Sequence, residues 1–261
     1  MTSAREEVRA RRQQRERFAH AKRSELWYSS QLREVARVIG TFTDIYDPKD
    51  ESTVTTLISA LKRYADILNP WAHSVAARML ADTDRRNARA WRQHGKEMGV
   101  ALREEIETAP TGETMRRLMS EQVTLIASLP LEAAQRVHEL AIEGRMDSSR
   151  GQDIYKMIME TGSVTASRAT LIARTETSRA AALLTEARAN YVGSEAYIWR
   201  TVGDSDVRPR HQALDGKVIR WSDPPVAGEN GERAHAGCIY NCRCWAEVIL
   251  PDHLQVSPNK R

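Results

Sequence analysis

The chain has 261 residues, 28% of them charged, with a mean hydropathy of −0.55 and a formal net charge of +4. No apolar run approaches the roughly 20 residues that span a bilayer, and no apolar stretch follows the basic N-terminus as in a secretory signal, so we expect no membrane partner. The three cysteines all lie between residues 238 and 244. They are too few and too close for a disulfide framework, which favours synthesis in a reducing cytosol.

Residues 1–23 form a basic N-terminal arm. The arm carries eight basic and three acidic side chains, a local net charge of +5, and the remaining chain is close to neutral. Such a segment can neutralise nucleic-acid phosphates and release their counterions, which gives binding without sequence preference. A solvated helical face is the alternative interpretation. The candidate DNA-binding residues are Arg5, Arg9, Arg11, Arg12, Arg15, Arg17, Lys22 and Arg23.

Residues 24–162 predict a helical body of five to seven helices with short connections. Apolar side chains from Val54 to Leu68 recur at helical spacing and form one stripe. Asn69-Pro70 ends this helix, because a residue before proline avoids the α region. The proline can then begin a second helix that extends along the sequence toward Glu107.

Proline and glycine divide the second half of this body. A helix follows Gly112, and we expect Pro130 to begin a separate helix that ends near Gly144. Residues 147–160 predict a short helix closed by Gly162. The body contains no visible catalytic constellation.

The composition changes at residue 163, which marks a boundary between domains. Residues 163–194 are rich in Ala, Ser and Thr and predict a polar helix whose small side chains permit close approach of its neighbours. Residues 196–202, 217–221 and 244–250 then predict strands, the second of them after the turn signal Asp215-Gly216. We therefore predict an α+β fold, in which a mainly helical N-terminal body precedes a small antiparallel β-containing C-terminal module.

The C-terminal module, residues 195–250, contains a cluster of cysteine and histidine. In Cys242-Arg243-Cys244 an extended backbone places both sulfurs on one face. Two thiolates on one face are half of a zinc site, and His211 and His235 can complete a tetrahedral set, with Cys238 as a substitute. The alternatives are that these are small buried residues with a histidine satisfied by a turn, or that two cysteines cross-link on oxidation.

A catalytic interpretation of the same module is also open. Asp204, Asp206 and His211 can form an acid and base group. Arg208 and Arg210 lie beside them in the sequence, which suits phosphodiester chemistry. These residue types are nevertheless common in any polar turn.

Seven short motifs follow one another through the last third of the chain. They are Ile172-Ala-Arg-Thr-Glu176, Thr201-Val-Gly-Asp204, Val207-Arg-Pro-Arg-His211, Leu214-Asp-Gly216, Pro224-Pro225, His235-Ala-Gly237 and Cys242-Arg-Cys244. Each motif is short, but their order and spacing together are specific. Over residues 163–250 the chain resembles the phage Mu F-like minor head protein family, also called phage head morphogenesis proteins.

The resemblance implies a minor capsid protein of a tailed bacteriophage that is synthesised in the host bacterial cytoplasm. Such a protein lies inside the head near the portal in few copies, and aids head assembly and DNA packaging or delivery. The implied partners are the portal protein, the major capsid or scaffold protein and packaged double-stranded DNA, and no enzyme activity is implied. The domains are then the arm (1–23), the helical body (24–162), the Mu F-like domain (163–250) and a C-terminal tail (251–261).

The resemblance also bears on the metal. Family members often have a C-x-x-C where this chain has Arg208-Pro-Arg-His211, and usually a His-Pro where it has His235-Ala236. A metal ligand tolerates exchange of Cys for His more readily than a packing residue does. The resemblance thus implies zinc held by His211, His235, Cys242 and Cys244. Two other functions stay open, a nuclease-like effector enzyme on a Mu F-like module and a non-specific nucleic-acid-binding protein that acts through the arm.

Overall fold

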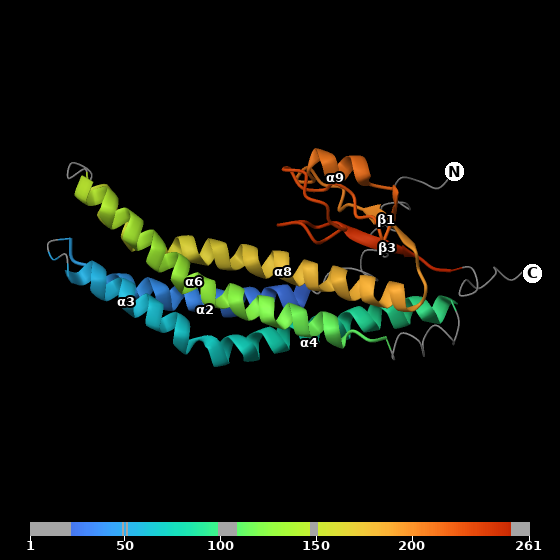
Figure 1. Ribbon diagram of the computed structural model, residues 1–261, viewed down its shortest axis with the longest axis horizontal. Helices are drawn as coiled ribbons and strands as arrows, with labels where there is room; N and C mark the ends of the chain where they lie inside the picture. Colours follow the sequence, from blue (N-terminus) through green and yellow to red (C-terminus); the bar gives the residue numbers. More distant parts are fainter. Residues whose placement is uncertain (1–21, 49, 51, 99–108, 147–150, 252–261) are drawn as a thin grey trace, which may run out of the picture. The chain divides into compact units, whose positions relative to one another are not determined.

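The computed structural model describes residues 22–48, 50, 52–98, 109–146 and 151–251 (Figure 1). Its helices precede a small antiparallel sheet, which confirms the α+β fold class. The arm residues from Arg5 to Arg17 lie outside the described residues, whereas Lys22 and Arg23 are exposed at the start of the first helix. None of the described helices combines the length and the apolar character needed to cross a membrane.

The helices follow the apolar stripes of the sequence except at Pro130 and at Gly162, which was predicted to close a helix but lies inside the helix Thr161–Tyr191. They are α2 (Lys22–Phe42), the short 3₁₀ helix η1 (Thr43–Ile45), α3 (Ser52–Ile67), α4 (Asn69–Met98), α6 (Gly112–Met146), α7 (Gly151–Met159) and α8 (Thr161–Tyr191). The break at Asn69-Pro70 is confirmed. The separate helix predicted to begin at Pro130 is wrong, because α6 continues through this residue. Pro130 is buried, and packing of its ring in the interior offsets the N–H that it cannot donate to the carbonyl oxygen of Ile126.

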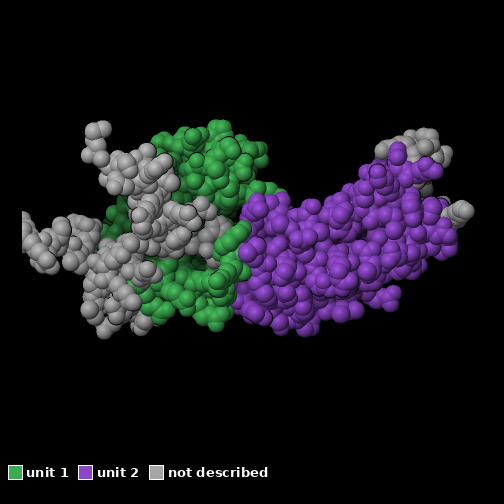
Figure 2. All heavy atoms as spheres, turned by 180° about the vertical axis from the view of Figure 1, so that it is seen from behind, with its two compact units in different colours: residues 1–24, 80–118, 175–261 green, residues 25–79, 119–174 purple. Residues whose placement is uncertain are grey.

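The described chain divides into two compact units (Figure 2). The first unit comprises the described residues within 1–24, 80–118 and 175–261, and the second unit comprises those within 25–79 and 119–174. Each unit contains segments from the body predicted over residues 24–162 and from the domain predicted over residues 163–250. The boundary between the units therefore does not coincide with the change of composition at residue 163.

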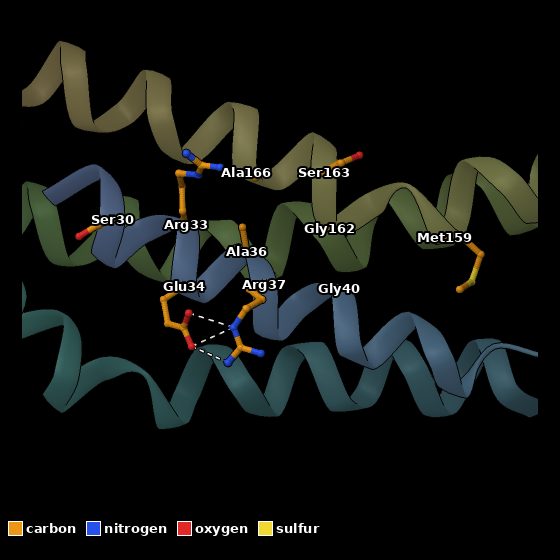
Figure 3. Close-up of a pocket in the computed structure, with 10 residues that line it drawn as sticks. All are labelled: Ser30, Arg33, Glu34, Ala36, Arg37, Gly40, Met159, Gly162, Ser163 and Ala166. Atoms are coloured by element: carbon orange, nitrogen blue, oxygen red, sulfur yellow. Dashed lines mark hydrogen bonds and ion pairs between the residues drawn. The ribbon is translucent and has the colours of Figure 1, made fainter. Parts of the chain in front are cut away.

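Helices α2 and α8 pack closely in the second unit at a pair of glycines. A Cβ atom added to Gly162 would lie 2.7 Å from the Cα of Gly40, so Gly162 has no room for a side chain, whereas a Cβ atom at Gly40 would meet the Cα of Gly162 at an ordinary 3.6 Å. A shallow surface groove runs along this contact, with Arg33 on its rim and an ion pair in which Nε of Arg37 lies 2.9 Å from an oxygen of Glu34 (Figure 3). Close packing of small residues thus defines this face of the second unit.

The C-terminal module belongs to the first unit. Its strands are β1 (Ala196–Arg200), β2 (Val218–Arg220) and β3 (Trp245–Ile249), in the antiparallel order β2-β1-β3. A six-residue helix that the sequence did not predict, α9 (Pro209–Leu214), precedes the turn at Asp215-Gly216. The side chains of Tyr197 and Trp199 alternate inward from β1 and join an apolar core with Trp91 of α4.

Candidate metal centre

His211 lies on α9 with its side chain in the interior. Proline at the start of α9 has its backbone angle already fixed for a helix, which places His211 in the first turn. His211 is 2% exposed, and its Nε2 lies 3.1 Å from the carbonyl oxygen of Ala227. A carbonyl oxygen only accepts, so Nε2 carries the proton and donates. The lone pair of Nδ1 is then free to bind a metal.

Cys242 and Cys244 supply two sulfurs to this nitrogen. Both residues are buried in the segment immediately before β3, and both side chains are directed to the same histidine. The Sγ atoms of Cys242 and Cys244 lie 3.6 Å and 3.5 Å from Nδ1 of His211. All three ligand atoms lie within 4.8 Å of one another. The fold therefore assembles one nitrogen and two sulfurs in a buried position.

These separations suit a tetrahedral zinc ion. Zinc bonds of about 2.3 Å to sulfur and about 2.0–2.1 Å to nitrogen, at a tetrahedral angle, place the nitrogen and each sulfur about 3.6 Å apart. The two observed separations agree with this value. An S–H···N hydrogen bond has a similar length, so direct metal analysis distinguishes the two.

Electrostatics favour one thiolate in the pair even without a metal. The pKa of Cys242 is well below its ordinary value, because the thiol of Cys244, the imidazole of His211 and the backbone N–H of Cys244 all stabilise its thiolate. The pKa of Cys244 is raised, because its proton is held by the Cys242 sulfur and because it is buried. A metal ion would replace the proton that the two sulfurs share.

The indole of Trp199 lies beside the site. Its ring contacts His211 edge-on, with centroids 5.5 Å apart. The indole N–H of Trp199 is buried and has no nitrogen or oxygen acceptor among the described residues. The same side chain favours the thiolate of Cys244. A charged or metal-bound sulfur is the acceptor that this N–H needs, so the donor set and its surroundings fit a metal thiolate.

His235 lies outside this group of three. The hydroxyl of Tyr197 donates to its Nδ1 (3.1 Å), and its Nε2–H donates to the carbonyl oxygen of Trp221 (3.2 Å). Burial lowers the pKa of His235, which keeps the ring neutral. The half-buried Cys238 is also outside the group, and burial raises its pKa to about 12. The structure thus assembles three of the four predicted ligands. His235 instead bonds Tyr197 and Trp221 and holds its own loop against the sheet.

The residues of the catalytic interpretation are not brought together. The carboxylates of Asp204 and Asp206 lie 2.6 Å and 3.3 Å from the guanidinium of Arg243. Arg208 donates to the carbonyl oxygen of Tyr240 (2.9 Å), and His211 points inward to the sulfurs. A shared acid and base group therefore does not form from these residues.

Comparison with known proteins assigns the segment that holds this site. Residues 135–247 match the family described as Phage Mu protein F like protein. This segment of the chain is similar to the Mu F-like family. The Mu F-like segment begins inside α6, earlier than the predicted residue 163, and ends within β3, so it includes α8 and the whole cysteine and histidine cluster.

One relative extends the similarity over most of the chain. A Haemophilus influenzae protein described as uncharacterized is 26% identical over 256 residues, which is 92% of this chain and 56% of the relative. The chain thus spans little more than half the length of this relative. No solved structure matches the chain.

Sequence reasoning missed three contributors to the site. The carbonyl of Ala227 and the indole of Trp199 were not predicted, because neither residue type by itself indicates a metal site. Thr175 belongs to the Ile172–Glu176 motif, but its hydrogen bond with the backbone of Asn241 arises only from the fold. The alternation of aromatic residues along β1 was the available signal for Trp199.

Proposed function

We propose that the chain is a minor head protein of a tailed bacteriophage, with a structural rather than an enzymatic role. The match of residues 135–247 to the Mu F-like family carries this proposal. The protein acts inside the head near the portal, where it aids head assembly and DNA packaging or delivery. Its partners are the portal protein and the major capsid or scaffold protein, and the basic arm over residues 1–23 contacts packaged DNA.

Mass spectrometry of purified heads tests this role. We expect the protein in heads at a small fraction of the copy number of the major capsid protein, and cross-linking should connect it to the portal. Heads that lack the protein altogether would contradict the proposal. A nuclease assay on the purified protein, with His211→Ala as the matched control, should show no activity that depends on the histidine.

We further propose that His211, Cys242 and Cys244 hold a zinc ion that stiffens the C-terminal module. The nitrogen-to-sulfur separations of 3.5 Å and 3.6 Å support this, together with the hydrogen bond that fixes the histidine tautomer. When bound, zinc would join α9 to the start of β3, two segments more than 30 residues apart. Three protein ligands leave the fourth position of a tetrahedral ion to another donor.

Elemental analysis tests the metal directly. Protein purified without chelator should contain close to one equivalent of zinc, and the double variant His211→Ala, Cys244→Ser should contain almost none. Cys238→Ser is the control that removes a thiol outside the group and should retain the metal. Less than about a tenth of an equivalent of any metal in the unaltered protein would refute the metal centre.

A further inference from the structure

Helix α8 contacts the backbone of the cysteine loop at Asn241. The backbone N–H of Asn241 donates to Oγ1 of Thr175 at 3.0 Å, across 66 residues of sequence. Thr175 is 7% exposed. Its motif, Ile172-Ala-Arg-Thr-Glu176, lies in the segment that matches the Mu F-like family. The partner of this hydroxyl is the residue immediately before the first cysteine of the site.

The conformation of Asn241 determines where the chain enters the cysteine pair. Asn241 has a φ of +53°, a left-handed conformation that asparagine adopts more readily than most other residues and that turns the chain just before Cys242. The next N–H, that of Cys242, donates to the carbonyl oxygen of Ile239 (3.0 Å) and closes a turn. The N–H of Cys244 donates to the sulfur of Cys242 (3.4 Å). One tight turn therefore sets the positions of both sulfurs.

A second contact with α8 supports the same loop from its other side. Gly237 has a φ of +88°, and a Cβ atom there would lie 3.1 Å from the Cβ of Ala182 and 3.1 Å from the carbonyl oxygen of Cys244. The backbone of Gly237 therefore fits between α8 and the backbone of Cys244. Helix α8 thus contacts the loop at Gly237, before the turn, and at Asn241, within it.

We propose that Thr175 is a positioning residue for the metal centre. Its hydroxyl fixes Asn241 in the left-handed conformation, so that the sulfurs of Cys242 and Cys244 reach Nδ1 of His211 together. This inference rests on the proposed metal centre for its purpose, but the positioning itself can be measured in the absence of metal. It gives the Ile172–Glu176 motif a role in the same site as the Cys242-Arg243-Cys244 motif.

Three substitutions at Thr175 and one at a control position test the role of the Thr175 hydroxyl. Thr175→Val keeps the branched shape and removes the acceptor, whereas Thr175→Ser keeps the acceptor. Thr165→Val is the matched control, because Thr165 is also buried on α8 and its hydroxyl donates within the helix to the carbonyl oxygen of Thr161 (2.7 Å). Thr175→Ala is a second variant without the acceptor, in case the valine variant does not fold.

Cobalt(II) titration of the full chain reports the geometry at the sulfurs through sulfur-to-metal charge-transfer absorption. Loss of an outer-shell partner typically lowers metal affinity by about 10- to 100-fold, and we expect this loss in Thr175→Val and Thr175→Ala. Thr175→Ser and Thr165→Val should bind cobalt as the unaltered protein does. Affinity and spectrum that are unchanged in Thr175→Val would overturn the inference.

Thiol labelling of metal-free protein provides the second readout, in a Cys238→Ser background so that only the pair reacts. We expect several-fold faster labelling of Cys242 and Cys244 in Thr175→Val than in Thr165→Val, because the released turn exposes both sulfurs. If the unaltered protein binds no metal, the proposed metal centre fails, and the labelling rates still decide the positioning role. Equal rates in the two variants would overturn it.

Discussion

The two units of the chain are stabilised in different ways. The second unit packs apolar faces of α2, α3, α6 and α8, and its core residues Tyr28, Leu32, Leu57 and Leu61 are fully buried. The first unit also has an apolar core, but most of the buried polar residues among the described parts of the chain belong to it. These include the side chain of Arg188, which is 4% exposed.

This difference determines what each unit is sensitive to. Apolar packing depends on volume, and a well-packed helix contact tolerates little added bulk. Buried polar groups depend on their partners, because a buried donor or charge without a partner lowers the free energy of unfolding by about 1–3 kcal/mol or more. We therefore expect metal, pH and removal of polar partners to act on the first unit, and changes of side-chain volume to act on the second.

Metal removal should have the largest effect. A metal present at about 1,000 times its Kd stabilises the folded state by about 4 kcal/mol, so chelation should lower the melting temperature of the first unit strongly. The near-ultraviolet circular dichroism of Trp199, which contacts His211, should weaken at the same time. His211→Ala should remove the response to chelator. Identical melting curves with and without chelator would count against a structural metal.

Arg188→Met should destabilise the first unit by about 3 kcal/mol, because the carboxylate of Asp84 and the amide oxygen of Asn87 lose the guanidinium that donates to them. The guanidinium of Arg188 donates to Oδ1 of Asn87 (2.6 Å) and to Oδ1 of Asp84 (2.7 Å), which connects α8 to α4. Arg85→Met is the control, since Arg85 is 72% exposed and its removal should change the free energy of unfolding by at most about 0.5 kcal/mol. Urea unfolding compares them, and equal effects would show that burial is irrelevant here.

Gly162→Ala should destabilise the second unit by about 1–3 kcal/mol, because overpacking forces the helices apart. The added methyl would lie 2.7 Å from the Cα and 3.2 Å from the nitrogen of Gly40. Gly112→Ala is the control, since a methyl there meets only the side chain of Arg116 at 3.7 Å. Metal content should not change in either variant. Unchanged urea unfolding of Gly162→Ala would contradict the close contact.

Acid should weaken the first unit through His235, with the smallest of these effects. Burial lowers the pKa of His235 in the folded state, whereas the unfolded chain titrates near pH 6.5. Below about pH 6.5 the unfolded state then binds more protons, so the free energy of unfolding is full above this pH and falls as the pH decreases.

Glu186 is the control needed for this measurement. Its carboxylate lies 3.9 Å from Nε2 of His235, and burial raises its pKa, which acts in the opposite direction. Unfolding between pH 7.5 and 5.5 is therefore best compared in a Glu186→Gln background. His235→Gln should flatten the pH dependence there, and the same slope with and without the histidine would refute its role.

Local sequence patterns predicted the elements better than the contacts between them. The apolar stripe of α3, its end at Asn69-Pro70 and the three strands follow from side-chain periodicity and backbone preferences, which act over a few residues. Pro130 was predicted to begin a helix, but its ring is buried and α6 continues through it, which tertiary packing and not local preference decides. The short helix α9 was missed, since six residues show too little periodicity.

The sequence by itself predicted that Cys242 and Cys244 lie close together, because only one residue separates them, and the structure brings them together through a turn before β3. Only the tertiary structure decided which histidine they meet. His211 and His235 are equivalent in residue type, but Ala227 orients the first toward the sulfurs, whereas Tyr197 and Trp221 occupy both nitrogens of the second. These partners come from segments distant in sequence, and the packing of the loops that connect β1, β2 and β3 brings them to the histidines. Local periodicity contains no information about that packing.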